Sequence, residues 1–212
     1  MENTEASVYL VDDDPVILKV LPRALRRRGF QVQAFSSALD FLHAYSGTPG
    51  CLVLDLSLPN MTGLELQQEL IDRKFGIPII FITGHGGIRH SVKAMKSGAI
   101  DFLEKPFMPE ILLKRINEAF DSEQENRVRL QKIDEIQTRF STLTPRETEV
   151  FRLLIANEEI ASSKLIARQL GISHRTVDQH RAKILQKTKT KSIAELLILA
   201  REGGVDFEET AQ

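Results

Sequence analysis

The first 120 residues alternate short apolar runs with stretches in which apolar residues recur at helical spacing. The apolar runs cover residues 8–11, 30–35, 51–54, 77–82 and 100–103, and helices are expected over 15–28, from Ser36 or Ser37 to 42, over 64–73 and 88–97, and from about 109. Five strands that alternate with helices indicate one parallel sheet with right-handed crossovers. We therefore expect a doubly wound α/β domain with the flavodoxin-like strand order 2-1-3-4-5.

The composition changes after Phe120. Residues 121–140 are highly charged, contain neither Gly nor Pro, and consist mainly of strong helix formers. This predicts that the last helix of the first domain continues to about Thr138 and joins it to a second domain; a solvated flexible linker is the alternative. Apolar residues along this stretch hint at a weak coiled-coil contact; they are Leu130, Ile133, Ile136 and Phe140.

The remaining residues predict a small all-helical domain. Thr144, Pro145 and Glu147 form a capping box with proline in the first helical turn. Further helices are expected over 164–170, 174–187 and 193–199. The predicted division of the chain is a domain over 6–120, a helical linker over 121–140, a four-helix domain over 141–203 and a tail over 204–212.

Bulk properties exclude several classes of protein. Cys51 is the one cysteine, so the chain has neither a disulfide framework nor a thiolate metal site, which suits a reducing cytoplasm. No apolar run approaches the roughly 20 residues that span a bilayer, and the acidic, polar N-terminus is unlike a signal peptide. We expect a cytoplasmic protein without a membrane partner.

Acidic and polar residues follow four of the predicted strands. Asp12 and Asp13 follow the first, Asp55 the third, Thr83 the fourth and Lys105 the fifth. These strand ends meet at one edge of the sheet, where a hard divalent cation, Mg²⁺ (or Mn²⁺), offsets the repulsion between three carboxylates. A lysine and a hydroxyl beside that cation complete a site for a phosphoryl group, with Asp55 as the nucleophile that forms an acyl phosphate.

Five motifs occur in a characteristic order: Val11-Asp12-Asp13-Asp14, Asp55 with Pro59-Asn60-Met61-Thr62-Gly63, Thr83-Gly84-His85-Gly86, Ala94-Met95-Lys96-Ser97-Gly98-Ala99, and Asp101-Phe102-Leu103-Glu104-Lys105-Pro106-Phe107. With these motifs, residues 6–120 resemble the receiver domain of bacterial two-component response regulators. The resemblance implies that a sensor histidine kinase phosphorylates Asp55, and that Asp13, Asp55 and the Ser57 carbonyl bind Mg²⁺ with Asp12 acting through water.

The same resemblance implies a switch. Lys105 pairs with the phosphate, Thr83 moves toward the new oxygens, and Phe102 turns inward behind Thr83. The Lys105–Pro106 bond is expected to be cis. Phosphate adds up to two charges and three acceptors, and the altered surface promotes formation of a homodimer in this family.

A basic stretch in the second domain indicates nucleic-acid binding. Asp178 is the one acid between His174 and Lys191, against Arg175, Arg181, Lys183, Lys187, Lys189 and Lys191. Short capped helices around a Gly-containing turn match a helix-turn-helix. The motifs there are Leu143-Thr144-Pro145-Arg146-Glu147, Lys164-Leu165-Ile166-Ala167, Leu170-Gly171-Ile172-Ser173, Arg175-Thr176-Val177, His180-Arg181 and Ser192-Ile193-Ala194-Glu195-Leu196.

With these motifs, residues 141–203 resemble a LuxR-type helix-turn-helix domain, and the whole chain resembles the FixJ/NarL class of response regulators. The resemblance implies that cations hold phosphates of double-stranded DNA while Gln179 and Ala182 meet bases. The implied DNA-binding set is Lys164, Arg175, Thr176, Asp178, Gln179, Arg181, Ala182, Lys183 and Lys187.

Two departures from this family stand out. Residues 157–162 form a link about three residues longer than usual and lack Gly, which displaces the first helix or makes a protruding loop. Asp178 occupies a position where a basic residue is common. It either accepts a hydrogen bond from a cytosine amino group or weakens binding through phosphate repulsion.

The main expectation is a transcription factor in which phosphorylation of Asp55 promotes dimerisation and binding at target promoters. One alternative is a haloacid-dehalogenase-like phosphatase, because Asp12-Asp13-Asp14-Pro15-Val16 fits its Asp-x-Asp-x-Val motif with Asp12 as nucleophile. That class needs further acids on a strand after its lysine, whereas Lys105 is followed by Pro106-Phe107 and a helix. The other alternative is a DNA-binding regulator that does not depend on phosphorylation.

Overall fold

The computed structural model of the chain describes residues 7–84, 98–155 and 162–205. The chain divides into two compact units, residues 1–126 and 127–212. Within the described residues, each unit has its own hydrophobic core.

The N-terminal unit is built on a sheet whose paired strands are all parallel. Its five strands are β1 (Ser7–Val11), β2 (Gln31–Phe35), β3 (Gly50–Asp55), β4 (Ile79–Thr83) and β5 (Asp101–Glu104). Their order, β2-β1-β3-β4-β5, confirms the predicted doubly wound fold. β1, β3 and β4 are buried along their whole length, as expected for strands covered on both faces.

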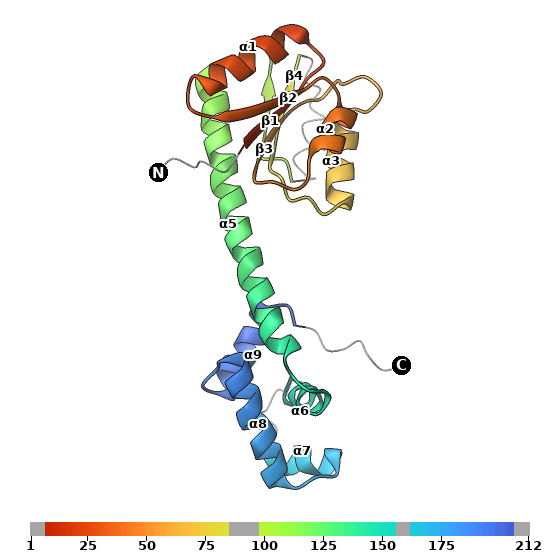
Figure 1. The fold of residues 1–212 in the computed structure, drawn as a ribbon, viewed down its shortest axis with the longest axis vertical. Helices are drawn as coiled ribbons and strands as arrows, with labels where there is room; N and C mark the ends of the chain where they lie inside the picture. Colours follow the sequence, from red (N-terminus) through yellow and green to blue (C-terminus); the bar gives the residue numbers. More distant parts are fainter. Residues whose placement is uncertain (1–6, 85–97, 156–161, 206–212) are drawn as a thin grey trace. The chain divides into compact units, whose positions relative to one another are not determined.

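Helices cover both faces of this sheet, as Figure 1 shows. They are α1 (Pro15–Arg26), α2 (Ala38–Ala44), α3 (Gly63–Asp72) and α5 (Pro109–Ser141). α1 and α5 bury Leu25, Leu112 and Ile116 against one face, and α2 and α3 bury Phe41 and Leu66 against the other. The helix predicted over 88–97 lies outside the described residues.

Side-chain caps set where the first helices begin. The side chains of Asp14, Ser37 and Thr62 each accept a hydrogen bond from a backbone N–H of the helix that follows. α1 ends at Arg26, earlier than the predicted residue 28, and the chain then turns at Gly29 with φ 91°.

α5 is one continuous helix through the stretch that was predicted to be helical, and it extends slightly beyond the predicted end, to Ser141. Ile136 and Phe140 are buried in the core of the C-terminal unit. These two residues therefore serve packing within the chain, not the coiled-coil contact that their spacing suggested. Gln137 Nε2 also donates a hydrogen bond to the Gly203 carbonyl at 3.0 Å.

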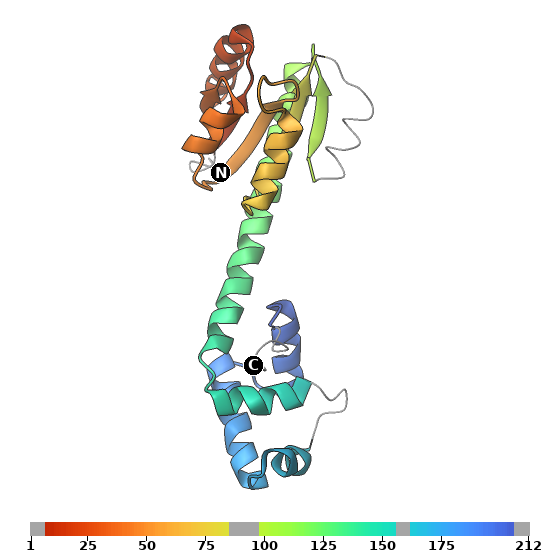
Figure 2. The same cartoon turned by 90° about the vertical axis from the view of Figure 1, so that its right-hand side faces the viewer.

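Helices joined by short turns make up the described residues of the C-terminal unit (Figure 2). After α5 come α6 (Pro145–Ile155), α7 (Ser163–Leu170), α8 (His174–Thr188) and α9 (Ile193–Glu202). Their apolar faces form one core that includes Val150, Leu154, Ile166, Val177 and Leu196. Most of the unusual link over 157–162 lies outside the described residues.

α7 and α8 are joined by the tight turn expected of a helix-turn-helix. Gly171 ends α7 in the left-handed conformation, with φ 64°, and Ser173 caps α8 by accepting from the Thr176 N–H. None of the described helices is long and apolar enough to cross a membrane.

Candidate functional site

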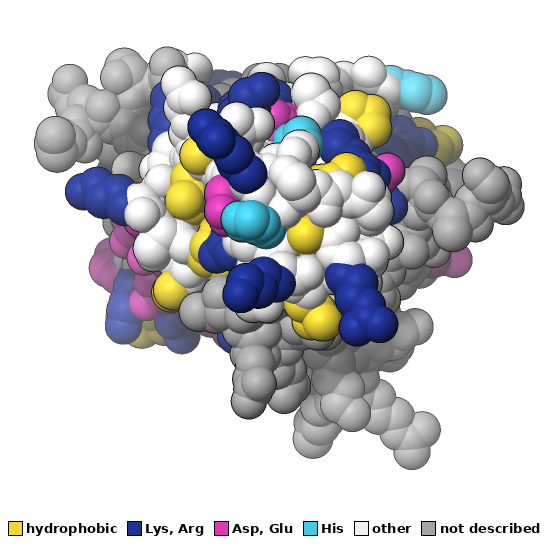
Figure 3. Space-filling view, turned by 90° about the horizontal axis from the view of Figure 1, so that it is seen from below, with side chains coloured by type: hydrophobic (Ala, Val, Ile, Leu, Met, Phe, Trp, Pro, Cys, Tyr) yellow, Lys and Arg dark blue, Asp and Glu magenta, His cyan; other side chains and the backbone are white. Residues whose placement is uncertain are grey.

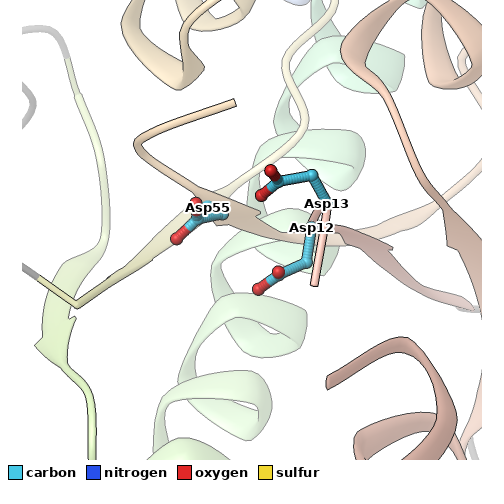
Figure 4. A group of neighbouring side chains, drawn as sticks. All are labelled: Asp12, Asp13 and Asp55. Atoms are coloured by element: carbon cyan, nitrogen blue, oxygen red, sulfur yellow. The ribbon is translucent and has the colours of Figure 1, made fainter. Parts of the chain in front are cut away.

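Three carboxylates meet at the carboxyl ends of two neighbouring strands. Asp12 and Asp13 follow β1 and Asp55 ends β3, and one carboxylate oxygen of each lies within 4.8 Å of the others. Figure 4 shows the three side chains turned toward a common space. Asp12 is fully buried and Asp55 is 5% exposed, whereas Asp13 is open to solvent. The structure therefore brings together the acids predicted to form one site.

Lys105 bridges two of these carboxylates. Its Nζ lies 2.6 Å from Asp12 Oδ2 and 3.2 Å from Asp55 Oδ1. The lysine follows β5 and is far from both partners in sequence, so the sheet order is what makes the contact. In this structure the Lys105 ammonium group contacts two of the three carboxylates that were predicted to surround a divalent cation.

The Asp12 carboxyl is held at an electrostatic cost. Burial raises its pKa, and the charge of Asp55 raises it further. Hydrogen bonds from Lys105 and from the Asp14 N–H lower that pKa but do not offset burial. Burial alone lowers the pKa of Lys105, but the contacts with Asp12 and Asp55 outweigh it, so the net pKa of the lysine is raised.

A close backbone approach holds the end of β3 in place. A Cβ added at Gly63 would lie 2.5 Å from the Asp55 carbonyl oxygen and 3.1 Å from the Cα of Leu56, so a side chain does not fit there. The Gly63 N–H donates to the Leu56 carbonyl at 3.0 Å, which closes the loop after Asp55. Within that loop the Ser57 N–H donates to Asp55 Oδ2 at 3.2 Å.

The two predicted switch residues lie on β4, which pairs with β3, and on β5, which pairs with β4. Thr83 ends β4 and is fully buried, and its carbonyl accepts a hydrogen bond from the Lys105 N–H at 2.7 Å. Phe102 on β5 is half-buried, with its ring centroid 6.4 Å from that of Phe81. The expected cis bond between Lys105 and Pro106 is present.

The donor set fits a hard divalent cation. Within the described residues, the group that could hold a metal consists of three carboxylates and no His or Cys, and oxygen-only ligands favour Mg²⁺ or Mn²⁺ over softer metals. Burial of Asp12 close to Asp55 leaves a repulsion that such a cation relieves.

A second candidate site lies on α8. Val177 and Ile184 are buried, whereas Arg175, Gln179 and Lys183 are exposed, so the helix turns one face to the core and another to solvent. Figure 3 looks from below, where α7 and the start of α8 lie in Figure 1, and shows Lys and Arg side chains spread over this face with few acids among them. Lys164 and Ala182 from the predicted DNA-binding set are also exposed.

Four members of that predicted set have partners within the chain. Lys187 Nζ lies 2.6 Å from Glu147 Oε2 and donates to the Thr142 carbonyl, which gives this lysine a partner inside the unit. Thr176 Oγ1 lies 2.8 Å from the Ser173 hydroxyl. Asp178 and Arg181 both contact Ser163, a residue that the sequence patterns did not single out.

Glu147 is a buried acid of the C-terminal unit, and its pKa is shifted in the opposite direction to that of Asp12. Burial acts to raise its pKa, yet hydrogen bonds from Lys187 and from the N–H and hydroxyl of Thr144 outweigh burial and lower it. The predicted capping box between Thr144 and Glu147 is thus present and is extended by Lys187.

Comparison with known proteins gives consistent results for both units. Residues 8–117 match the response regulator receiver domain, and residues 141–200 match the luxR family of bacterial regulatory proteins. Nodulation protein W of Bradyrhizobium diazoefficiens is 36% identical over 99% of the chain and 92% of that protein. Transcriptional regulatory protein FixJ of Rhizobium meliloti is 39% identical over 95% and 98%. The solved structure of the response regulator StyR is 41% identical, covers 93% of this chain and 99% of its own, and has a TM-score of 0.78.

Proposed function

The chain belongs to the response regulators that combine a receiver domain with a LuxR-type DNA-binding domain, and on this premise we propose that phosphorylation of Asp55 controls DNA binding by the α8 surface. It is a transcription regulator and not an enzyme, like the relatives it matches. We assign residues 6–120 to the receiver, 121–140 to a helical link, 141–203 to the DNA-binding domain and 204–212 to a tail.

The phosphoryl donor is a phosphohistidine of a sensor kinase. A carboxylate oxygen of Asp55 attacks phosphorus, the O–P bond forms, and the N–P bond breaks with its electron pair returning to the histidine ring. Lys105 already contacts Asp55 and is positioned to follow the charge onto the phosphoryl oxygens. The contact of Lys105 with both acids is the observation that carries the proposal.

Asp13, Asp55 and the Ser57 carbonyl would hold Mg²⁺ (or Mn²⁺), with Asp12 acting through water. The cation supplies neutralisation of the charge that accumulates on the phosphoryl oxygens. The chain's own residues do the remainder: the buried Asp12 orients Lys105, and the short loop ending at Gly63 fixes Asp55.

A groove beside the acidic site supports contact with the kinase. It has a volume of about 540 Å³ and lies between α1 and α5, with Lys105 and Asp14 among its lining residues. Its other lining is largely apolar, including Ile17, Leu21 and Phe107. Val20, which lines the groove, and Val16 on α1 are exposed apolar side chains that continue this surface.

The response to phosphate is a rearrangement of Thr83 and Phe102. Thr83 ends β4, the strand next to that of Asp55, and Phe102 lies on β5, the strand next to β4. Added oxygens draw the Thr83 hydroxyl toward them and leave room for the Phe102 ring. The changed surface favours a homodimer, which presents two α8 helices to a roughly two-fold-symmetric site in double-stranded DNA.

On DNA, Lys164, Arg175, Arg181 and Lys183 hold phosphates, and Gln179 and Ala182 face bases. Lys187 is left out of this set because Glu147 and the Thr142 carbonyl hold its ammonium group.

The test uses the full chain with acetyl phosphate and Mg²⁺. We expect one phosphoryl group on Asp55, a doubling of mass in sedimentation, and selection of a defined sequence from a randomised duplex library. Asp55→Asn should abolish all three effects, while Asp72→Asn, which changes an exposed acid at the end of α3, keeps them. Phosphate on another residue would refute the assignment of Asp55, and sequence selection that is equal with and without phosphate would support the phosphorylation-independent alternative.

A further inference from the structure

A polar relay ties the first residue of α7 to α8. Arg181 Nη1 donates to Ser163 Oγ at 2.8 Å, and the Ser163 hydroxyl donates to Asp178 Oδ1 at 2.5 Å. Asp178 and Arg181 are three positions apart on α8, so both reach the same hydroxyl. The Ser163 hydroxyl therefore donates a hydrogen bond to the carboxylate of Asp178 and accepts one from the guanidinium group of Arg181.

The Ser163 hydroxyl is free for this relay because its neighbour caps the helix. Ser162 is the N-cap residue of α7, and its Oγ accepts from the Leu165 N–H at 3.3 Å. Two adjacent serines therefore have different roles. One satisfies the end of α7, and the other joins α7 to the helix that carries the DNA-facing residues.

An acid at position 178 is unexpected on a helix that is proposed to face DNA phosphates. It is the one acid of α8, and it is exposed on a surface where nearby phosphates would repel it. One of its oxygens is already bonded to Ser163, which in turn orients Arg181. An unrestrained Arg side chain loses rotamer freedom when it binds phosphate, and a side chain that is held beforehand loses less.

We propose that Ser163 and Asp178 are positioning residues for DNA recognition, holding Arg181 and the start of α7 in the geometry that a specific DNA site requires. This inference rests on the proposed DNA binding by α8 and deepens it. Asp178 acts through Ser163 instead of reading a cytosine, so its contribution is spread over the whole site and not confined to one base pair.

The test measures how strongly the full chain, treated with acetyl phosphate and Mg²⁺, prefers a duplex selected by the unaltered protein over an unrelated duplex. The ratio of the two affinities removes sequence-independent effects of charge. Ser163→Ala and Asp178→Ala should each lower this ratio about five- to tenfold. The double variant should lose no more than either single variant, because each substitution alone already breaks the relay.

Two conservative variants separate the relay from the charge. Asp178→Asn keeps an oxygen that accepts from Ser163, so the ratio should stay near its original value while affinity for both duplexes rises. Ser163→Thr keeps the hydroxyl and should also preserve the ratio. Gln186→Ala, at an exposed position of the same helix, is the matched control.

Three results would overturn the relay. They are an unchanged ratio in Ser163→Ala, losses that add in the double variant, and a loss in Asp178→Ala confined to one base pair when each position of the site is varied. The last result would identify Asp178 as a base reader. If the unaltered protein selects no sequence at all, the proposed DNA binding fails, and the relay inference fails with it.

Discussion

Each unit contains a buried carboxylate that a lysine contacts at the same distance, yet the two acids behave in opposite ways. Lys105 lies 2.6 Å from Asp12, and Lys187 lies 2.6 Å from Glu147. The pKa of Asp12 is raised because burial dominates and Asp55 adds repulsion. The pKa of Glu147 is lowered because Lys187 and Thr144 together outweigh burial.

The difference separates a reactive site from a structural one. The Glu147 carboxylate accepts hydrogen bonds within its own unit from Lys187 and from the Thr144 N–H, and the Thr144 side chain also lowers its pKa. Asp12 shares its lysine with Asp55, so the N-terminal site retains an unrelieved repulsion. A divalent cation can relieve that repulsion. The pair of Lys187 and Glu147 has the same separation but leaves no such repulsion for a cation to relieve.

The comparison is tested most strongly by removing each lysine and measuring phosphorylation. Lys105→Met should slow labelling of Asp55 by acetyl phosphate about 100-fold, because the variant lacks the ammonium group next to the charge that develops on the phosphoryl oxygens. This factor is equivalent to about 2.7 kcal/mol of activation free energy. Lys187→Met should label at the original rate. Equal rates for the two variants would mean that the pairs do not differ in function.

A backbone variant tests whether the N-terminal site depends on close fit. Gly63→Ala should lower the free energy of unfolding of the N-terminal unit by about 2 kcal/mol, because the new methyl group overlaps the Asp55 carbonyl and forces the loop to move. Denaturant titration measures this loss. Gly76→Ala is the control, since a Cβ there meets nothing within 4 Å; a similar loss in both variants would contradict the steric explanation.

For the free energy of unfolding, the change at Lys187 should have a clear effect, although it leaves phosphorylation unchanged. Lys187→Met leaves Glu147 buried without its cation and should destabilise the C-terminal unit by about 1 to 2 kcal/mol, less than for a fully buried pair because Lys187 is partly exposed. Thermal unfolding of the variant measures this loss. The exposed Lys183→Met should leave stability unchanged but weaken DNA binding, and a larger DNA defect in Lys187→Met than in Lys183→Met would restore Lys187 to the DNA-binding set.

The smallest expected effect is a change in the pH dependence of stability. The folded pKa of Glu147 lies below its ordinary value of 4.5, so its contribution is fully present above pH 4.5 and is lost as pH falls through the folded pKa. Glu147→Gln should flatten this part of the stability curve of the C-terminal unit. An unaltered acid slope in the variant would show that other carboxylates cause it.

Much of the N-terminal site was predictable because the order of the parallel strands determines which residues meet at the edge of the sheet. Asp12, Asp55 and Lys105 each follow an apolar run, and parallel strands bring such ends together however far apart they are in sequence. Residues that the sequence brings together only through helix packing were harder to predict. Lys187 resembles any cation of a basic helix until α6 places the buried Glu147 beside it.

The same limit applies to Ser163 and to the end of α5. Ser163 is one of two adjacent serines, and nothing local indicates which caps the helix and which contacts α8. Ile136 and Phe140 have the spacing of a coiled-coil seam, and helical spacing does not identify the surface against which a side chain packs.

The shared helix α5 restricts where this chain can be divided. Leu112, Ile116 and Phe120 belong to the core of the receiver, and Ile136 and Phe140 to that of the DNA-binding unit. Every residue from 124 to 132 is exposed. A gene fusion or proteolytic cut within this short interval leaves both halves with their buried side chains. A junction at residue 140, just before the predicted start of the second domain, would instead remove Ile136 and Phe140 from the core of the C-terminal fragment.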